Sequence, residues 1–412
     1  MAPRAGNEPK DPKKPKPFPW VQALNGQPIG ASNALAYVQA LKQYISPNMK
    51  TLLFDYPNWD ASKAGWYNQP WLANIREPLY GMYLGSEFAP SVYPGTGLTG
   101  SMKTYVLTFY DTTAAYTLGK VWGVDAMKPV VNDPKVTQFA EGSVILKLAV
   151  TTASPKEWPV MTNAVTLPIY IPPVDDSSNQ PGIVHSSLMQ VDIIVKDTKT
   201  APKTGWVFTT LVYDQNAAGE SGWDRMVPLG AQWGNDPQAV DASKPLRENV
   251  INPDAPLYSV QTLGWNGRLS GPNDGAVLTP AYVNGVMIPS GEYSGAAVSS
   301  CMSCHGTAAW PMKSFLLPNV TYPPSSYPPG DLNGALMVPT PGSSQWMNWF
   351  KSRPGTQPQD EGTVAFDYDM VFVFKSLPAW QQATQNLDPQ EFMDIERADK
   401  IRRRIGSSHK SK

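Results

Sequence analysis

The chain has 412 residues and a formal net charge of −1 at pH 7, so no excess of basic residues indicates nucleic-acid binding. Charged residues make up only 16% of the sequence, whereas it contains 42 prolines and 32 glycines, which favours a turn-rich fold with little long helix. No run of about 18 apolar residues is present, so no transmembrane segment is expected.

The first 90 residues predict a linker, one helix and a set of loops. Residues 1–19 are rich in lysine and proline and predict a disordered linker without the apolar stretch of an export signal. Apolar residues recur at helical spacing over Ser32–Ile45, which predicts the first helix. The aromatic segment 50–90 is broken by proline and glycine, and predicts packed loops over a sheet.

Strand patterns dominate from about residue 100 to 235, in six short runs rich in β-branched and aromatic residues. The runs are 105–110, 116–122, 143–152, 167–171, 188–196 and 206–213. Because no helical pattern separates them, a doubly wound α/β fold is disfavoured. We expect a β-sandwich or barrel-like domain over residues 20–254.

The remainder of the chain predicts short helices and loops. Ser343 caps one helix that reaches Phe350, and Tyr368–Leu377 predicts another that Pro378 should end. Residues 255–385 would form a small helical domain, and 386–412 an amphipathic helix with a basic tail. The expected fold class is therefore mainly β with a small α-helical domain.

Cys301-Met-Ser-Cys304-His305 is the most specific motif in the sequence. Cys-x-x-Cys-His attaches a c-type haem: the thiols form thioethers with the porphyrin, and the histidine is the proximal ligand of the iron. A structural zinc site needs four ligands, and a thioredoxin-like pair needs no following histidine. The chain has no other cysteine, so we expect one covalent haem c, with its iron bound by His305, in a small c-type cytochrome domain over 255–385.

The second axial ligand of the iron separates the possible functions. A methionine sulfur gives a high-potential electron carrier, whereas an open position lets small molecules bind. Met337, in a loop after the motif, is the favoured candidate, and Met312 is too close to His305 in sequence to reach the far face. The alternatives are Met370, Met347 and His185.

Three further residues are candidates for contact with the porphyrin. Arg268 could pair with a propionate, since arginine binds carboxylates in bidentate fashion. Trp265 and Trp310 are candidate walls, with ordinary core packing as the competing interpretation.

Covalent haem attachment takes place outside the bacterial cytoplasm, on an exported chain. We therefore expect a periplasmic or extracellular protein whose export signal is absent from this numbering.

Several stretches besides the motif resemble bacterial proteins described only as the cytochrome c family, and the resemblance covers most of residues 65–375. It implies a monohaem cytochrome with a large non-haem domain, and it assigns no substrate. The stretches are Trp71 with Arg76-Glu-Pro78, Gly205-Trp-Val-Phe208, Trp223-Asp224, Val227-Pro-Leu-Gly230, Trp233-Gly-Asn-Asp-Pro237, Leu263-Gly-Trp-Asn-Gly-Arg-Leu-Ser-Gly-Pro272, Trp346-Met-Asn-Trp-Phe350 and Asp367-Tyr368.

Two functions from different classes follow. The favoured one is a cytochrome that transfers electrons to or from a partner protein. The alternative is a haem enzyme, peroxidase-like or oxygen-using, with a substrate pocket in the β-rich domain. A single haem argues against a dihaem peroxidase, and no hydrolase, P-loop or Rossmann motif competes. The chain is longer than a carrier requires, which indicates recognition of a specific partner or an oligomeric assembly.

Overall fold

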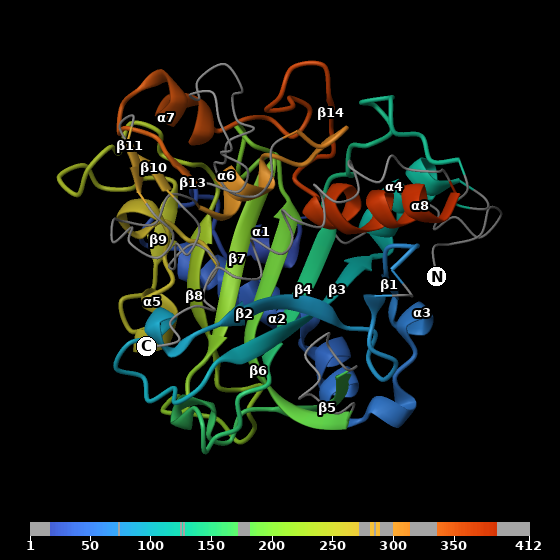
Figure 1. Cartoon of the computed structure of the whole chain (residues 1–412), viewed down its shortest axis with the longest axis vertical. Coiled ribbons are helices and arrows are strands. Elements are labelled where there is room, and N and C mark those ends of the chain that lie inside the picture. Colours follow the sequence, from blue (N-terminus) through green and yellow to red (C-terminus); the bar gives the residue numbers. More distant parts are fainter. Residues whose placement is uncertain are drawn as a thin grey trace.

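The computed structural model describes residues 17–72, 75–123, 126, 128–171, 182–271, 281–283, 286–288, 300–313 and 336–384. Its centre is one antiparallel sheet of nine strands (Figure 1). The strand order is β1-β3-β4-β6-β7-β8-β9, while β2 pairs with β3 and β5 pairs with β6. The strands are β1 (Trp66–Tyr67), β2 (Tyr83–Phe88), β3 (Met102–Asp111), β4 (Val144–Thr151), β5 (Thr166–Ile171), β6 (Gly182–Lys196), β7 (Trp206–Tyr213), β8 (Met226–Gln232) and β9 (Asn249–Ile251).

Two smaller sheets lie in the C-terminal part of the chain. One has three strands, in which β10 (Ala281–Val283) pairs with β11 (Val286–Ile288) and, in parallel, with β13 (Leu336–Val338). The other pairs β12 (Ala309–Trp310) with β14 (Val364–Ala365).

The helices are short apart from one. None of those described is long and apolar enough to cross a membrane. They are α1 (Pro19–Gln22), α2 (Ala34–Phe54), α3 (Ala61–Ala64), α4 (Thr112–Trp122), α5 (Leu257–Val260), α6 (Cys301–His305), α7 (Ser344–Trp349) and α8 (Leu377–Thr384).

The central strands are covered on both faces, which is why every residue of β7 is buried. Successive side chains of a strand point to opposite faces. Val207 and Leu211 therefore join the hydrophobic cluster that contains α2, whereas Trp206 and Phe208 join the cluster that contains α4 and Met302 of α6. Figure 1 shows α2 behind the central strands, with α6 and α8 on the viewer's side.

Most of the predicted elements are confirmed, and one strand is wrong. The runs 105–110, 143–152, 167–171, 188–196 and 206–213 lie in β3 to β7, and the first predicted helix lies in α2. The run 116–122 belongs instead to α4. Its start is fixed by Asp111, whose Oδ1 accepts a hydrogen bond from the Ala114 N–H at 2.9 Å and so caps the helix.

The expected sandwich or barrel-like arrangement is also wrong. The nine strands form one open sheet, in which β1 and β9 are end strands that do not pair with each other. Because helices and loops cover both faces, the sheet needs neither a second sheet nor closure to bury its apolar residues.

The helix predicted to stop at Pro378 continues beyond it. A wide π-helical turn, Phe372–Ser376, leads without a break into α8, so Pro378 lies inside a continuous helical stretch rather than at its end. The helix predicted after Ser343 is confirmed as α7, with the Ser343 hydroxyl accepting from the Trp346 N–H.

The described part of 255–385 packs on the sheet. Met302, Phe366 and Phe372 share a hydrophobic cluster with Ile145 and Phe208 of the strands, and a separate helical cytochrome domain is not seen among the described residues. The linker predicted over 1–19 is described only from residue 17, with α1 beginning at Pro19, and the predicted basic tail 386–412 lies outside the described residues.

Replacement of Ile193 by alanine should lower the free energy of unfolding by about 2–5 kcal/mol, because its fully buried side chain packs between the sheet and α2. Ile183→Ala is the matched control, since Ile183 lies on the same strand and is 62% exposed. It should cost less than about 1 kcal/mol. Urea unfolding of both variants measures the difference, and equal losses would contradict this description of the core.

Candidate functional site around the Cys-x-x-Cys-His helix

A single row of side chains crosses the sheet face beneath the motif. Residues directly opposed in antiparallel strands point to the same face, and neighbouring strands lie about 4.8 Å apart. The row consists of Tyr67, Tyr110, Ile145, Ile194, Phe208, Gln232 and Asn249. It forms a floor on which α6 and the segment 366–372 are placed.

The motif itself forms α6, a helix of five residues with a complete capping box. The Ser300 hydroxyl accepts from the Ser303 N–H at 3.1 Å, and the Ser303 hydroxyl accepts from the Ser300 N–H at 2.7 Å. Cys301, Cys304 and His305 stand at positions i, i+3 and i+4, so both thiols and the imidazole lie on one side of the helix. The two cysteines are half-buried and are not joined in a disulfide.

Two backbone N–H groups in the first turn of α6 connect the helix to the floor, one directly and one through Leu269. The Met302 N–H donates to Gln232 Oε1 at 3.0 Å. The Cys301 N–H donates to the Leu269 carbonyl at 2.8 Å, and the Leu269 N–H donates to Asn249 Oδ1 at 3.1 Å. The N–H groups that any helix leaves without an intrahelical partner are thus used to fix its position.

Asn235 connects α6 with two other segments. Its Oδ1 accepts from the Ser300 hydroxyl at 2.5 Å, its N–H donates to the Ser352 hydroxyl at 3.0 Å, and its carbonyl accepts from Arg268 Nε at 2.9 Å. A polar side chain that is 1% exposed therefore has its hydrogen bonds satisfied within the site.

Arg268, the predicted partner of a propionate, is fully buried and supports the loop after β8. Four of its five N–H groups donate to backbone carbonyls at 2.7–3.1 Å, those of Asn235, Trp265, Asp236 and Ala239. Burial lowers the pKa of Arg268 to about 10. A bidentate contact with a carboxylate would have to break one of these bonds, so the predicted role is not favoured by the geometry.

His305 is held by a hydrogen bond from its ring to the backbone. Its Nδ1 lies 2.9 Å from the Tyr368 carbonyl oxygen, and Phe208 packs edge-on against the ring with centroids 5.0 Å apart. A carbonyl only accepts, so Nδ1 carries the hydrogen. In the corresponding neutral tautomer Nε2 is the nitrogen with the lone pair, which is the arrangement usual for histidine ligands of a metal.

The carbonyl that holds His305 belongs to a strained stretch of backbone. Asp367 and Tyr368 have φ angles of 47° and 70°, in the left-handed region that residues other than glycine rarely adopt. Such conformations cost about 1 kcal/mol or more each and persist only where the surroundings enforce them.

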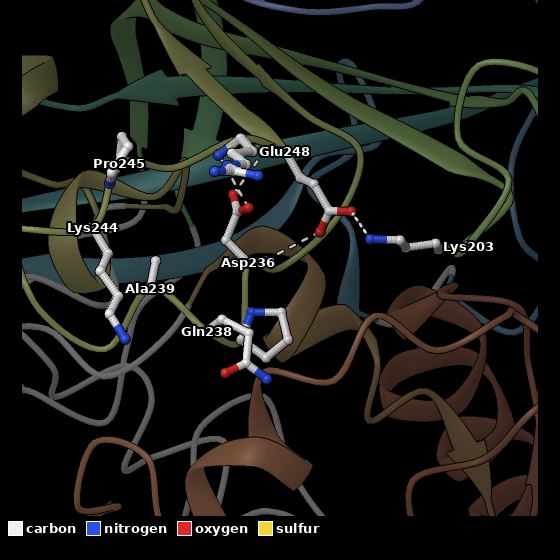
Figure 2. A pocket seen from close by; sticks show the side chains of 9 residues that line it. Lys203, Asp236, Gln238, Ala239, Lys244, Pro245 and Glu248 are labelled. Carbon is white, nitrogen blue, oxygen red and sulfur yellow. Dashed lines mark hydrogen bonds and ion pairs between the residues drawn. The ribbon is translucent and has the colours of Figure 1, made fainter.

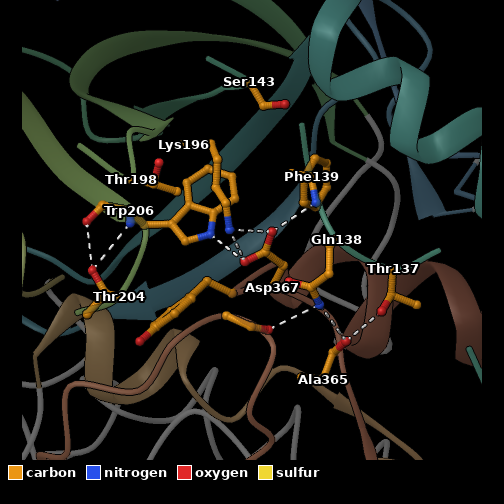
Figure 3. Close-up of polar contacts among 12 residues, drawn as sticks. Thr137, Gln138, Phe139, Ser143, Lys196, Thr198, Thr204, Trp206, Ala365 and Asp367 are labelled. Atoms are coloured by element: carbon orange, nitrogen blue, oxygen red, sulfur yellow. Dashed lines mark hydrogen bonds and ion pairs between the residues drawn. The ribbon is translucent and has the colours of Figure 1, made fainter. Parts of the chain in front are cut away.

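The Asp367 carboxylate supplies that enforcement through four hydrogen bonds (Figure 3). It accepts from Lys196 Nζ at 2.7 and 2.8 Å, from Trp206 Nε1 at 2.7 Å and from the Phe139 N–H at 2.9 Å. Lys196 and Trp206 are opposed in register on β6 and β7, on the face that carries the floor. The sheet therefore fixes Asp367, and Asp367 fixes the carbonyl that orients His305.

The approach to Asp367 also explains one glycine. A Cβ added at Gly355 would lie 1.6 Å from Asp367 Oδ1, which no side chain can tolerate. The chain passes this close because the Gly355 N–H donates to the Thr204 carbonyl and its own carbonyl accepts from Gln138 Nε2, both at 3.2 Å.

Aromatic side chains border the thiols. Trp346 and Trp349 of α7 and Phe350, which follows it, form a small buried cluster, and Cys304 and Trp265 pack against it. Trp265 meets Trp346 edge-on, with centroids 5.0 Å apart. The other predicted wall, Trp310, is half-buried in β12 at the edge of the cluster that contains Met302.

The candidate axial ligands are placed as follows. Met337 lies in β13 opposite Tyr282, and its side chain is outside the described residues, so its role stays a prediction. Met370 is 4% exposed and receives a contact from the Thr307 hydroxyl at 3.5 Å, a position that favours core packing. Met347, half-buried on α7, packs against the same aromatic cluster as Cys304.

His185 is excluded as a ligand of an iron bound to His305. It is exposed on β6, where it pairs with Pro168 of β5. Phe208, which contacts His305, pairs with Ile194 on the same strand. The two positions on β6 are separated by about 30 Å of strand.

No motif in the sequence marks Gln232, Asn249 and Lys196 as members of the site. Asn235 and Asp367 stand in the stretches that carry the family resemblance, which assigns them no role. None of these residues can be recognised from its local sequence, because polar residues are common in strands and turns. They lie near α6 only because of the register between strands that are distant in the sequence.

No group of three or more His, Cys, Asp or Glu side chains within the described residues is arranged to hold a metal ion. Comparisons with protein-family models, curated proteins and solved structures give no match for this chain. The resemblance to the bacterial cytochrome c family therefore stays a prediction.

Lys196→Met should lower the free energy of unfolding by about 3–5 kcal/mol, because it leaves the Asp367 charge buried without its cation. Lys63→Met makes the same chemical change in an ion pair whose lysine is 85% exposed, and should cost no more than about 0.5 kcal/mol. Urea unfolding measures both. A small effect of Lys196→Met would show that Asp367 is held without the ion pair.

The free energy of unfolding should depend on pH through the buried carboxyl group of Asp369. Complete burial raises its pKa from 3.8 to about 7, although Tyr110 and Gln69 donate hydrogen bonds to it. An acid with a raised pKa binds more protons in the folded state, so its contribution to stability is present at low pH and is lost as pH rises towards 7. Asp369→Asn should therefore gain stability relative to the wild type, by up to about 1.4 kcal/mol per pH unit between pH ~5 and ~7, with no further gain above that range.

The exposed Asp60 gives the control for this experiment. Hydrogen bonds from Ser62 and Lys63 lower its pKa to about 2, so Asp60→Asn should differ from the wild type by a constant amount over the same pH range. Thermal or urea unfolding at several pH values measures both variants. If the curves of the wild type and Asp369→Asn run parallel, the pKa of Asp369 is not raised.

Proposed function

We propose that this chain is a monohaem c-type cytochrome, with haem attached through Cys301 and Cys304 and with His305 as proximal ligand. The observation that supports the proposal best is the hydrogen bond from His305 Nδ1–H to the Tyr368 carbonyl. In the neutral tautomer that this bond favours, Nε2 carries the lone pair, and the imidazole belongs to the same short helix that presents both thiols. A thioredoxin-like dithiol has no use for a histidine held in this way.

The residues present fit such a group. A bound haem c would supply a one-electron Fe(III)/Fe(II) couple. The chain contributes a helix face with two thiols and an imidazole, a backbone carbonyl that fixes the plane and tautomer of that imidazole, and aromatic side chains that keep water from the side of Cys304. Met337 remains the proposed second axial ligand.

Electron exchange with a partner protein is the activity we favour. A carrier works best when its metal ligand does not move between oxidation states. His305 meets this requirement, because its hydrogen-bond acceptor is part of a backbone held by the buried Lys196–Asp367 ion pair. We place the protein outside the cytoplasm, since covalent haem attachment takes place there.

The first experiment tests attachment. The chain is produced behind an export signal in a bacterium that matures c-type cytochromes, and haem is assayed by mass spectrometry after denaturation. The wild type and Met302→Leu, a control within the same helix that keeps both thiols, should retain haem. Cys301→Ala with Cys304→Ala should lose all of it. Haem that survives in the double variant, or that never attaches to the wild type, would overturn the proposal.

Carbon monoxide then separates electron transfer from catalysis. The absorption spectrum of the reduced, matured protein should not change on addition of carbon monoxide, because a second protein ligand closes the iron. A prompt shift would mean an open position, and would replace the electron carrier by a haem enzyme that uses peroxide or oxygen.

A further inference from the structure

A pocket of about 450 Å³ lies beside the loop that follows β8. It is lined by Asp236, Gln238, Lys244 and Arg247 of the loop 234–248, by Glu248 and by Lys203 from the turn between β6 and β7. Its volume is within the range usual for small-molecule sites. Figure 2 shows Lys244 and Lys203 on opposite sides, with Asp236 and Glu248 between them.

The two carboxylates of the pocket are already used within the protein. Asp236 accepts from the backbone N–H groups of Arg247 and Glu248 at 3.0 and 2.8 Å. Glu248 Oε1 accepts from Lys203 Nζ at 2.6 Å, and Oε2 accepts from the Asp236 N–H at 3.2 Å. These hydrogen bonds fix the shape of the loop, and the Glu248 charge is also paired with the Lys203 ammonium.

The lining side chains carry a positive formal net charge, because Lys203, Lys244 and Arg247 outnumber Asp236 and Glu248. Lys244 and Arg247 are exposed, and within the described residues neither forms an ion pair, although Asp241 lies near enough to Lys244 to interact with its charge. An arginine guanidinium and a lysine ammonium are the groups that proteins use to bind carboxylates. Pro237, Ala239 and Pro245 add short apolar walls between them.

The wall of the pocket is also fixed in advance. Asp236 has a φ of 47°, a left-handed conformation that costs free energy in a residue other than glycine. A Cβ at Gly234 would lie 2.2 Å from Glu248 Oε2, so the loop passes close to this carboxylate only because residue 234 has no side chain. Arg268 and the Trp346 indole clamp the inner side of this loop by binding the carbonyls of Asp236, Pro237 and Ala239. A rigid, strained and concave wall is typical of a binding site, because little ordering remains to be done when a ligand binds.

We propose that this pocket binds a small organic anion, with a carboxylate held by Arg247 and Lys244 and an apolar part against the proline and alanine walls. The site does not depend on haem, and the inference stands or falls separately from the proposed function. It adds a ligand to the loop whose residue Asn235 contacts Ser300 at the start of α6.

Calorimetric titration of the full chain at constant ionic strength tests the proposal. The probes are benzoate, succinate and citrate, with benzamide as the neutral match for benzoate. At least one carboxylate should bind saturably with a dissociation constant below about 1 mM, and benzamide should bind at least about tenfold more weakly than benzoate where benzoate binds. If none of the three carboxylates binds, the proposal is wrong.

Paired variants assign the binding to the pocket. Lys244→Gln with Arg247→Gln should weaken the carboxylate at least about tenfold. Lys135→Gln with Lys156→Gln removes the same charge from exposed positions elsewhere and should change affinity less than about twofold. Equal weakening by both pairs would show general charge attraction only and would overturn the site.

A measurement on the wild type avoids any effect of substitution on folding. Arginine modification by phenylglyoxal is followed residue by residue by mass spectrometry. The bound carboxylate should slow the modification of Arg247 severalfold and leave that of Arg225, which does not line the pocket, unchanged. Unchanged modification of Arg247 at saturating carboxylate would contradict the proposal.

Discussion

The site depends on the register of the central sheet. Tyr110, Phe208, Gln232 and Asn249 stand in one row because β3, β4, β6, β7, β8 and β9 pair without a slip at that level. A shift of one residue in any strand would turn its side chains to the α2 face. Gln232 would then leave the Met302 N–H, and Phe208 would leave the His305 ring. The sheet is therefore the template on which five residues of helix acquire a fixed position.

Strain at residues 367–368 is the cost of that position. Two consecutive left-handed residues are unfavourable, and a buried ion pair with a desolvated lysine contributes little net stability in comparison with apolar packing. The ion pair matters for orientation, because a carboxylate that accepts four hydrogen bonds from fixed donors can adopt only one orientation. Lys196 and Trp206 supply three of these bonds from adjacent strands. Favourable packing in the core thus offsets the strain that orients the Tyr368 carbonyl towards Nδ1 of His305.

The sequence predicted what is local and failed where partners are distant. Cys301, Cys304 and His305 are recognisable because their spacing alone puts them on one helix face, and β7 was found to the residue because its composition favours a strand. The run 116–122 was mistaken for a strand because alternation over seven residues also fits a buried helix, and its cap lies outside the run at Asp111. Arg268 was assigned to a propionate because charge alone does not reveal that four carbonyls surround it. Gln232 and Lys196 are brought to the site only by the register of the strands, which no local sequence pattern encodes.

The loop after β8 connects the Cys-x-x-Cys-His helix with the pocket lined by Arg247 and Lys244. Asn235 points its side chain to Ser300 at the start of α6, while the next residue, Asp236, points to the pocket lined by Arg247 and Lys244. Arg268 holds the carbonyls of both residues, so neither can turn without disturbing the other. A ligand in the pocket and the position of α6 therefore act on the same few backbone dihedral angles. This shared loop gives the large strand region a role beyond support, because it joins a surface that can select a small anion to the helix that carries the two thiols and the imidazole.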